Sequence, residues 1–168
     1  GAVAGSGNYI GGLIGRTNGA VKKSYARSGS VTGQDWVGGL IGYSASTIET
    51  SFAIRSVSGV NRVGGLAGDV ASNSFGIRDC YAQASVSGAT RVGGLVGWNE
   101  AASNITRCYA SGSLTLTGAG PIGALAGENQ GGANANNYWN TGTTALPGIG
   151  AGVTGGPAHV MPGYDYAD

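Results

Sequence analysis

Two cysteines are the residues of this chain best spaced for side-chain chemistry. Cys80 and Cys108 each precede a Tyr-Ala pair, so they hold the same place in two successive repeats. If the repeats stack, the two backbones lie about 4.8 Å apart at this point, which suits a disulfide in a secreted protein. We expect a bridge. Two buried reduced thiols are the alternative, and metal binding is disfavoured because further ligands are lacking.

Other side chains give little support for catalysis. The one histidine, His159, lies in a Gly/Pro-rich stretch, and the eight carboxylates do not recur at one position of the repeat. The chain has no HExxH zinc motif, and its glycine words lack the Lys-Ser/Thr of a phosphate-binding loop. We therefore expect no enzyme activity, cofactor or metal. A carbohydrate-active enzyme, with a carboxylate pair formed between neighbouring repeats, is one alternative.

Three aromatic residues are the best candidates for contact with a partner. Trp36 directly precedes a glycine word, and Tyr43 and Trp98 directly follow one. The residue type varies from repeat to repeat at both positions, as it does at solvated sites. We predict that these side chains face outward and form a contact surface.

The cysteines and these aromatic residues lie at fixed places relative to a short sequence that is repeated along the chain. A glycine-leucine-glycine word returns at Gly11, Gly38, Gly64, Gly93 and Gly123, which lie 27, 26, 29 and 30 residues apart. Each unit holds three short β-prone runs separated by Gly, Ser and Asn, and such a unit cannot close a core alone. The sequence predicts an all-β fold, a parallel β-solenoid of about five three-sided coils. Parallel crossovers are strongly biased, which predicts a right-handed coil.

The columns of equivalent residues indicate which side chains face inward. An invariant leucine and a β-branched residue in each word predict the core, at Leu13, Leu40, Leu66, Leu95 and Leu125 and at Ile10, Val37, Val63, Val92 and Ile122. The glycine pair between them predicts a bend or bulge. Columns on either side, including Arg62 and Asp69, are predicted to face outward.

A further column is aromatic, with its members at Tyr25, Phe52, Tyr81, Tyr109 and Tyr138. Internal stacking of the rings is the favoured interpretation of this column. An exposed platform for sugar rings or a partner surface is the alternative.

Composition excludes several partners. Nine basic and eight acidic residues leave a net charge of +1, so the chain has no electrostatic footprint for nucleic acid or an anionic membrane. No apolar run reaches the roughly 18 residues of a membrane span, which predicts no membrane insertion.

The two ends differ from the centre. Residues 1–141 carry the repeats, and the Gly/Pro-rich residues 142–168 predict an irregular C-terminal cap or tail. The segment 2–5 aligns with 30–33, so the chain is expected to begin partway through a coil, as a processed product or a fragment of a longer array. An open coil end is a sheet edge that invites pairing.

The glycine words and the intervening I-x-x-C/S-Y-A units resemble the GLUG repeat over residues 2 to about 141. The segment 137–141, N-Y-W-N-T, is similar to the N-Y-W-D-T segment that often closes such arrays. The resemblance implies a secreted or surface-attached bacterial protein, such as a haemagglutinin-like adhesin. We expect a non-enzymatic structural or adhesive module, a rod segment that contacts a cell-surface glycan or protein. The alternative is a subunit of an extracellular fibre, joined end to end to copies of itself by β-augmentation.

Overall fold

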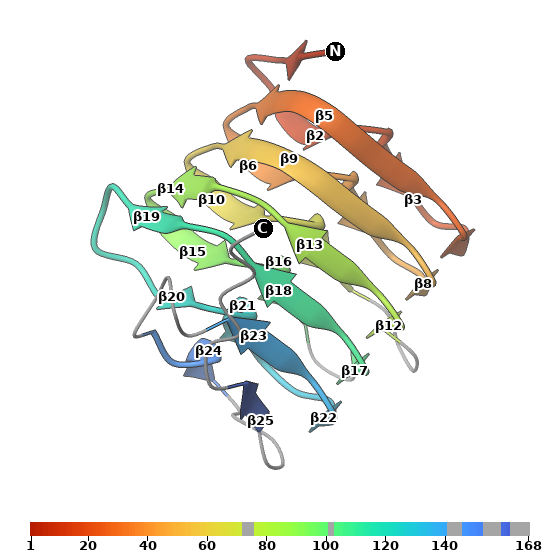
Figure 1. Ribbon diagram of the computed structural model, residues 1–168. Helices are drawn as coiled ribbons and strands as arrows, with labels where there is room; N and C mark the ends of the chain where they lie inside the picture. Colours follow the sequence, from red (N-terminus) through yellow and green to blue (C-terminus); the bar gives the residue numbers. More distant parts are fainter. Residues whose placement is uncertain (72–75, 101–102, 141–145, 153–158, 162–168) are drawn as a thin grey trace, which may run out of the picture.

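The chain winds into a parallel β-solenoid of about five coils, stacked from β1 at one end to β25 at the other (Figure 1). The computed structural model describes residues 1–71, 76–100, 103–140 and 146–152, and the backbone of 159–161. These residues form strands and contain no helix. They therefore include no apolar helix of the length needed to cross a membrane. The predicted all-β fold, a parallel β-solenoid of about five coils, is confirmed.

Four parallel sheets run along the solenoid, and each coil gives at least one strand to every sheet. Sheet A holds β1 (Val3–Ala4), β5 (Tyr25–Thr32), β9 (Phe52–Ser58), β13 (Tyr81–Gln83), β14 (Val86–Gly88), β18 (Tyr109–Ser111), β19 (Leu114–Leu116), β23 (Tyr138–Asn140) and β25 (His159–Met161). Sheet B holds β2 (Asn8–Gly11), β6 (Asp35–Gly38), β10 (Asn61–Gly64), β15 (Thr90–Gly93) and β20 (Ile122–Gly123). Sheet C holds β3 (Ile14–Thr17), β7 (Ile41–Ser44), β11 (Ala67–Val70), β16 (Val96–Asn99), β21 (Ala126–Asn129) and β24 (Ile149–Gly152). Sheet D holds β4 (Val21–Lys22), β8 (Ile48–Glu49), β12 (Ile77–Arg78), β17 (Ile105–Thr106) and β22 (Asn134–Ala135).

The coil has four sides where the sequence predicted three, because each glycine word forms two strands. In the second coil β6 ends at Gly38 and β7 begins at Ile41, so the predicted bend lies at Gly39 and Leu40. The bend turns both predicted core columns inward: Val37 and Leu40 are fully buried. The register stacks like on like, since Val63 pairs with Val37 and with Val92.

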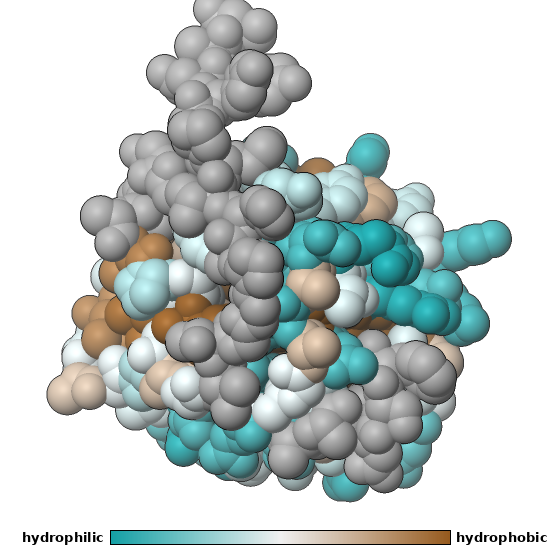
Figure 2. Space-filling model, turned by 90° about the horizontal axis from the view of Figure 1, so that it is seen from below, coloured by the Kyte–Doolittle hydropathy of each residue, from teal (hydrophilic) through white to brown (hydrophobic). Residues whose placement is uncertain are grey.

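The predicted core is confirmed in the three middle coils, whereas Ile10 of the first coil and Ile122 of the fifth are only partly buried. The leucine column is buried at Leu40, Leu66, Leu95 and Leu125, but Leu13 is 54% exposed. Leu13 belongs to the first coil, so the equivalent Leu40 lies on one side of it and no equivalent residue of the described chain lies on the other. Seen from the end that carries β25, apolar residues form a band across the section and hydrophilic residues lie at its rim (Figure 2).

The cross-section of the solenoid is narrow where small glycine and alanine residues face each other. This narrow part, called the waist below, divides the core into two clusters. A methyl group added at Gly65 would overlap the carbonyl oxygen of Gly94 and lie 3.0 Å from the Cβ of Ala82 in sheet A. Gly39 meets Ala53 in the same way, and Gly94 meets Ala110. In these three coils glycine is therefore needed at the second position of the word, because two backbones nearly touch across the coil, whereas the fifth word has Ala124 there.

The segment predicted to be irregular, 142–168, contributes two strands. β24 pairs in register with β21, and β25 pairs with β23. The last full coil presents unpaired backbone N–H and C=O groups along its edge, and these strands satisfy them. The C-terminal segment therefore adds part of a further coil.

Candidate functional site

The aromatic column lies on the outer face of sheet A, which corrects the expectation of internal stacking. The five rings are in register along β5, β9, β13, β18 and β23. Each ring is followed by a buried residue, Ala26, Ala53, Ala82, Ala110 or Trp139. Side chains alternate along a strand, and the waist has room for little more than a methyl group in the alanine coils, so the ring must face outward. At the two ends of the column, Tyr25 is 59% exposed and Tyr138 is 38% exposed.

The rings are closely stacked over the first three coils only. Tyr25 and Phe52 stack with ring centroids 5.2 Å apart, and Phe52 and Tyr81 with centroids 4.7 Å apart. The guanidinium of Arg27 lies 5.3 Å from the centroid of Phe52. Within the described chain no stacking contact joins Tyr81 to Tyr109. The column therefore opens where it enters the fourth coil.

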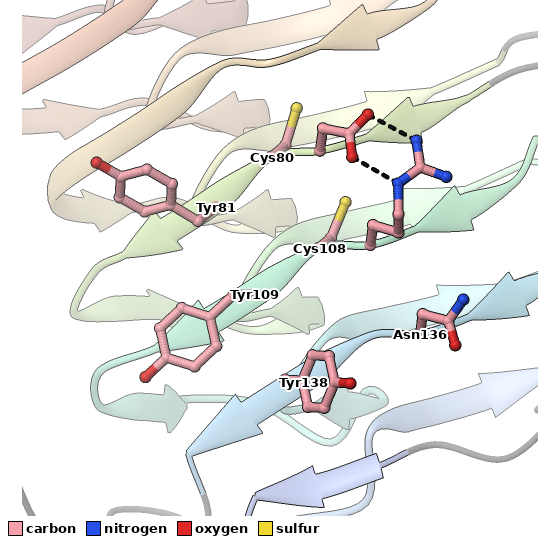
Figure 3. Close-up of a pocket in the computed structure, with 8 residues that line it drawn as sticks. Cys80, Tyr81, Cys108, Tyr109, Asn136 and Tyr138 are labelled. Atoms are coloured by element: carbon pink, nitrogen blue, oxygen red, sulfur yellow. Dashed lines mark hydrogen bonds and ion pairs between the residues drawn. The ribbon is translucent and has the colours of Figure 1, made fainter. Parts of the chain in front are cut away.

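A groove of about 570 Å³ lies at this opening and crosses the last three full coils (Figure 3). It is lined by the same three-residue unit from each coil, namely Asp79-Cys80-Tyr81, Arg107-Cys108-Tyr109, and Asn136 with Tyr138. The three tyrosines project from sheet A on one side of the groove, and the side chain of Asn136 lies on the other. Because the coils stack in parallel, the equivalent residues of three coils form one continuous surface.

A left-handed backbone position sets the polar side of the groove. Asp79 and Arg107 have φ of 53°, and Asn136 has φ of 55°. This conformation turns the chain sharply from sheet D into sheet A, and it favours Asn and Asp among residues other than glycine. These residues were not predicted from the sequence. The available signal was the opposite charge of Asp79 and Arg107 at one position of successive repeats.

Asp79 and Arg107 form a bidentate ion pair at the rim of the groove. Arg107 donates from Nε to Oδ1 at 2.6 Å and from Nη2 to Oδ2 at 2.7 Å. These hydrogen bonds lower the pKa of the Asp79 carboxyl and raise the pKa of the Arg107 guanidinium. Both side chains are exposed, at 38% and 55%. Their charges cancel, so the rim is polar but neutral.

Cys80 and Cys108 are both free thiols in the structure, and the predicted disulfide is not formed. Each Sγ donates to the carbonyl two residues earlier, at 3.0 Å for Cys80 and 3.2 Å for Cys108. Ser24 and Ser51 make the same bond at the equivalent position. The thiols therefore take the place of serine hydroxyls in this column. Burial, followed by hydrogen bonding to Cys80, raises the pKa of Cys108.

The predicted contact residues Trp36, Tyr43 and Trp98 lie on a second surface, along sheets B and C. Trp36 has φ of 53°. The Arg62 guanidinium lies between two indoles, 4.4 Å from the centroid of Trp36 and 4.2 Å from that of Trp98. Tyr9 stacks on Trp36 at 4.7 Å and meets Tyr43 edge to face at 5.7 Å. These side chains are half-buried against one another, so the structure brings the predicted surface together as a packed ladder of aromatic and arginine side chains.

Asp69 is fully buried within this ladder, although its column was predicted to face outward. Asp69 pairs with Tyr43 on one neighbouring strand and with Trp98 on the other, and these large side chains cover it. Trp36 Nε1 donates to Oδ2 at 2.7 Å and Arg62 Nη1 lies 3.4 Å from the same oxygen, while Oδ1 has no partner. Burial, reinforced by the charge of Glu100, raises the pKa of Asp69 to about 7.

Two other acidic groups, Glu49 and Glu128, are held in ion pairs. In the described part of the chain, Glu49 lies 3.1 Å from Lys22 and 2.9 Å from Arg78, and Glu128 lies 2.6 Å from Arg91. No group of three or more His, Cys, Asp and Glu residues in this part could hold a metal ion. His159 lies in β25, and its side chain is outside the described residues.

Fold and surface together define a parallel β-solenoid built of sequence repeats, with an aromatic column along one face. Residues 88–117 match the family model described as the GLUG motif. This stretch runs from the last residue of β14 through β19, so it includes Arg107 and Tyr109 of the groove. The resemblance seen in the sequence is confirmed, and the chain carries a GLUG repeat. Comparisons with curated proteins and with solved structures gave no match.

Proposed function

We propose that this chain is a non-enzymatic extracellular module, a rod segment of a bacterial surface adhesin that is secreted or held at the cell surface. The observation that carries the proposal is the aromatic column of sheet A, which presents rings outward in all five coils. The solenoid fold and the GLUG motif are consistent with an extracellular repeat module.

A stacked rod suits adhesion for a physical reason. Each coil adds one aromatic residue to the same face at a spacing of about 4.8 Å, so a partner with a regular surface meets several equivalent contacts at once. Weak contacts that engage together give an avidity far above that of any one of them. The backbone ladders hold the rings in place, so little conformational freedom is lost on binding.

An adhesion assay with a matched variant tests this proposal. Beads that carry the purified chain would be washed over surfaces coated with glycans or with extracellular proteins. We expect retention on at least one surface, and a marked fall in retention for the double variant Tyr25→Ala, Tyr109→Ala. The control is Ser58→Ala, because Ser58 is exposed on the same sheet outside the column. No retention on any surface, or equal retention of the double variant, would contradict the adhesive role.

The fibre alternative takes support from the two ends of the solenoid. Leu13 is exposed at the first coil, and β24 and β25 show that further strands add in register to the last coil. A second copy could continue the stack in the same way. Sedimentation velocity at rising concentration tests this idea: polymers should form, and Leu13→Asp should abolish them. A chain that stays monomeric rules out the fibre and leaves the adhesive role standing.

A further inference from the structure

We infer that the groove of the last three full coils binds an uncharged glycan chain, with sugar rings against Tyr109 and hydroxyl groups at the Asp79–Arg107 pair. The inference rests on the proposed adhesive function and specifies its ligand. It is drawn from the shape of the groove, the arrangement of its rings and the balance of charge at its rim.

The groove has the size and form of a site for a polymer. Its volume of about 570 Å³ lies within the range of roughly 300 to 1,000 Å³ that is usual for small-ligand sites. It crosses three coils on an outer face and is not a closed chamber (Figure 3). An internal stretch of a long chain can therefore enter it, and no chain end is required.

Tyr109 supplies the groove with a flat apolar surface that no described aromatic ring stacks on. Over the first three coils Phe52 stacks on Tyr25 and on Tyr81, so each of these rings has at least one π face covered. Tyr109 has no such partner in the described chain, and its ring projects beside the groove. A pyranose ring has one face of C–H groups, which packs on an aromatic face as another apolar ring does.

The opposite side of the groove supplies hydrogen bonds without a net charge. Each Asp79 oxygen accepts one bond from Arg107 and keeps a free lone pair, and the guanidinium keeps N–H groups that Asp79 does not use. The exposed amide of Asn136 adds both a donor and an acceptor. Hydroxyl groups donate and accept, so a polyhydroxylated ligand can use all of these groups.

Charge decides between an uncharged glycan and an anionic one. Among the described residues that line the groove, Arg107 is the one cation, and Asp79 already holds it in a bidentate pair. An anionic sugar would have to displace Asp79 or lie beside it, and both arrangements carry an electrostatic penalty. The groove therefore favours neutral sugars over uronic acids or sulfated chains.

Titration of the full chain with defined oligosaccharides tests the inference. The probes are uncharged oligomers of β-linked glucose, mannose and N-acetylhexosamine, and an oligouronate of equal length serves as the anionic comparison. Calorimetry measures the binding of each oligomer. We expect at least one uncharged oligomer to bind and the oligouronate to bind more weakly. Tyr109→Ala should lower the affinity about tenfold. Arg107→Gln should lower it severalfold without removing any ring.

Two controls keep the result interpretable. Ser58→Ala, on the same sheet outside the column, should change affinity less than twofold. Tyr25→Ala, which removes a ring of the column outside the groove, should lower the affinity for the oligomers less than Tyr109→Ala does. Thermal melts show that each variant folds. Equal losses for Tyr25→Ala and Tyr109→Ala would place binding on the whole column and overturn the groove assignment. Failure of every uncharged oligomer, or preference for the oligouronate, would also overturn it. If beads still adhere to a protein surface in that case, the adhesive function stands and the inference alone fails.

Discussion

Asp69→Asn tests whether a buried carboxylate weakens this fold above neutral pH. The side chain faces Arg62 and Trp36, with the charges of Glu100 and Arg91 nearby. Asn keeps an oxygen that accepts from the Trp36 indole, has nearly the same shape and carries no charge. The substitution therefore isolates the effect of the charge.

The sign follows from the direction of the pKa change. Because the pKa of Asp69 in the folded chain is raised, the folded state holds its proton while the unfolded state has already lost it. The stability associated with the protonated form is present below the ordinary pKa of 3.8 and is lost as the pH rises to about 7. Since one pKa unit corresponds to about 1.4 kcal/mol, the loss reaches at most about 4 kcal/mol.

Urea unfolding at pH 4.5, 6 and 8, followed by far-UV circular dichroism, measures this effect. The wild-type free energy of unfolding should fall by about 2 to 4 kcal/mol from pH 4.5 to 8. Asp69→Asn should show a much flatter profile. At pH 8 the variant should be the more stable protein, because it no longer buries a charge. The gain should be about 1 to 3 kcal/mol, less than the full loss, because the variant also loses the attraction to Arg62.

Asp79→Asn is a control of opposite sign. The Arg107 pair lowers the pKa of Asp79, so its contribution to stability is present at pH 8 and is lost only as acid protonates the carboxyl. This variant should be slightly less stable than wild type at pH 8. A wild-type stability that rises from pH 4.5 to 8, or an Asp69→Asn variant that is less stable at pH 8, would refute the argument.

Three other predictions concern the core, the thiols and the backbone. Leu66→Ala should cost about 2 to 5 kcal/mol in urea melts, whereas Leu13→Ala should cost well under half of that, because Leu13 is 54% exposed; equal costs would mean that the first coil is covered. Thiol titration without reductant should find no reactive thiol in the native protein and both Cys80 and Cys108 after unfolding; none after unfolding would indicate a bridge. Thr50→Asn should raise the free energy of unfolding by about 1 kcal/mol, since a β-branched residue there has φ of 51°; a loss of stability would contradict this account.

The repeat could be recognised in the sequence because each coil is related to the next by a shift along the solenoid axis. Residues one repeat apart lie on neighbouring strands, so the invariance of Leu40, Leu66 and Leu95 and the β-branched column beside them identified an inward face without any structure. The same reasoning gave the parallel solenoid and the bend in the glycine word. It placed Cys80 and Cys108 in adjacent coils, where the structure has them.

The cross-section of the coil was decided only by the tertiary structure. Periodicity shows which residues stack, but not which residues meet across the coil. The close approach of Gly65 to Ala82 forces Tyr81 outward, and this approach cannot be deduced from the spacing of residues along the chain. In the same way, Asp69 is buried by the bulk of Tyr43 and Trp98 rather than by its own type.

The groove depended on the backbone as well. Asp79, Arg107 and Asn136, all with left-handed φ, line the groove two positions before the tyrosine of the same coil. Residues other than glycine seldom adopt this conformation, so the sequence alone favoured ordinary strand alternation at these positions. The sequence therefore determined the order of residues along the solenoid axis. The shape of each coil around that axis came from backbone bends and steric contacts that act only once the coils are closed.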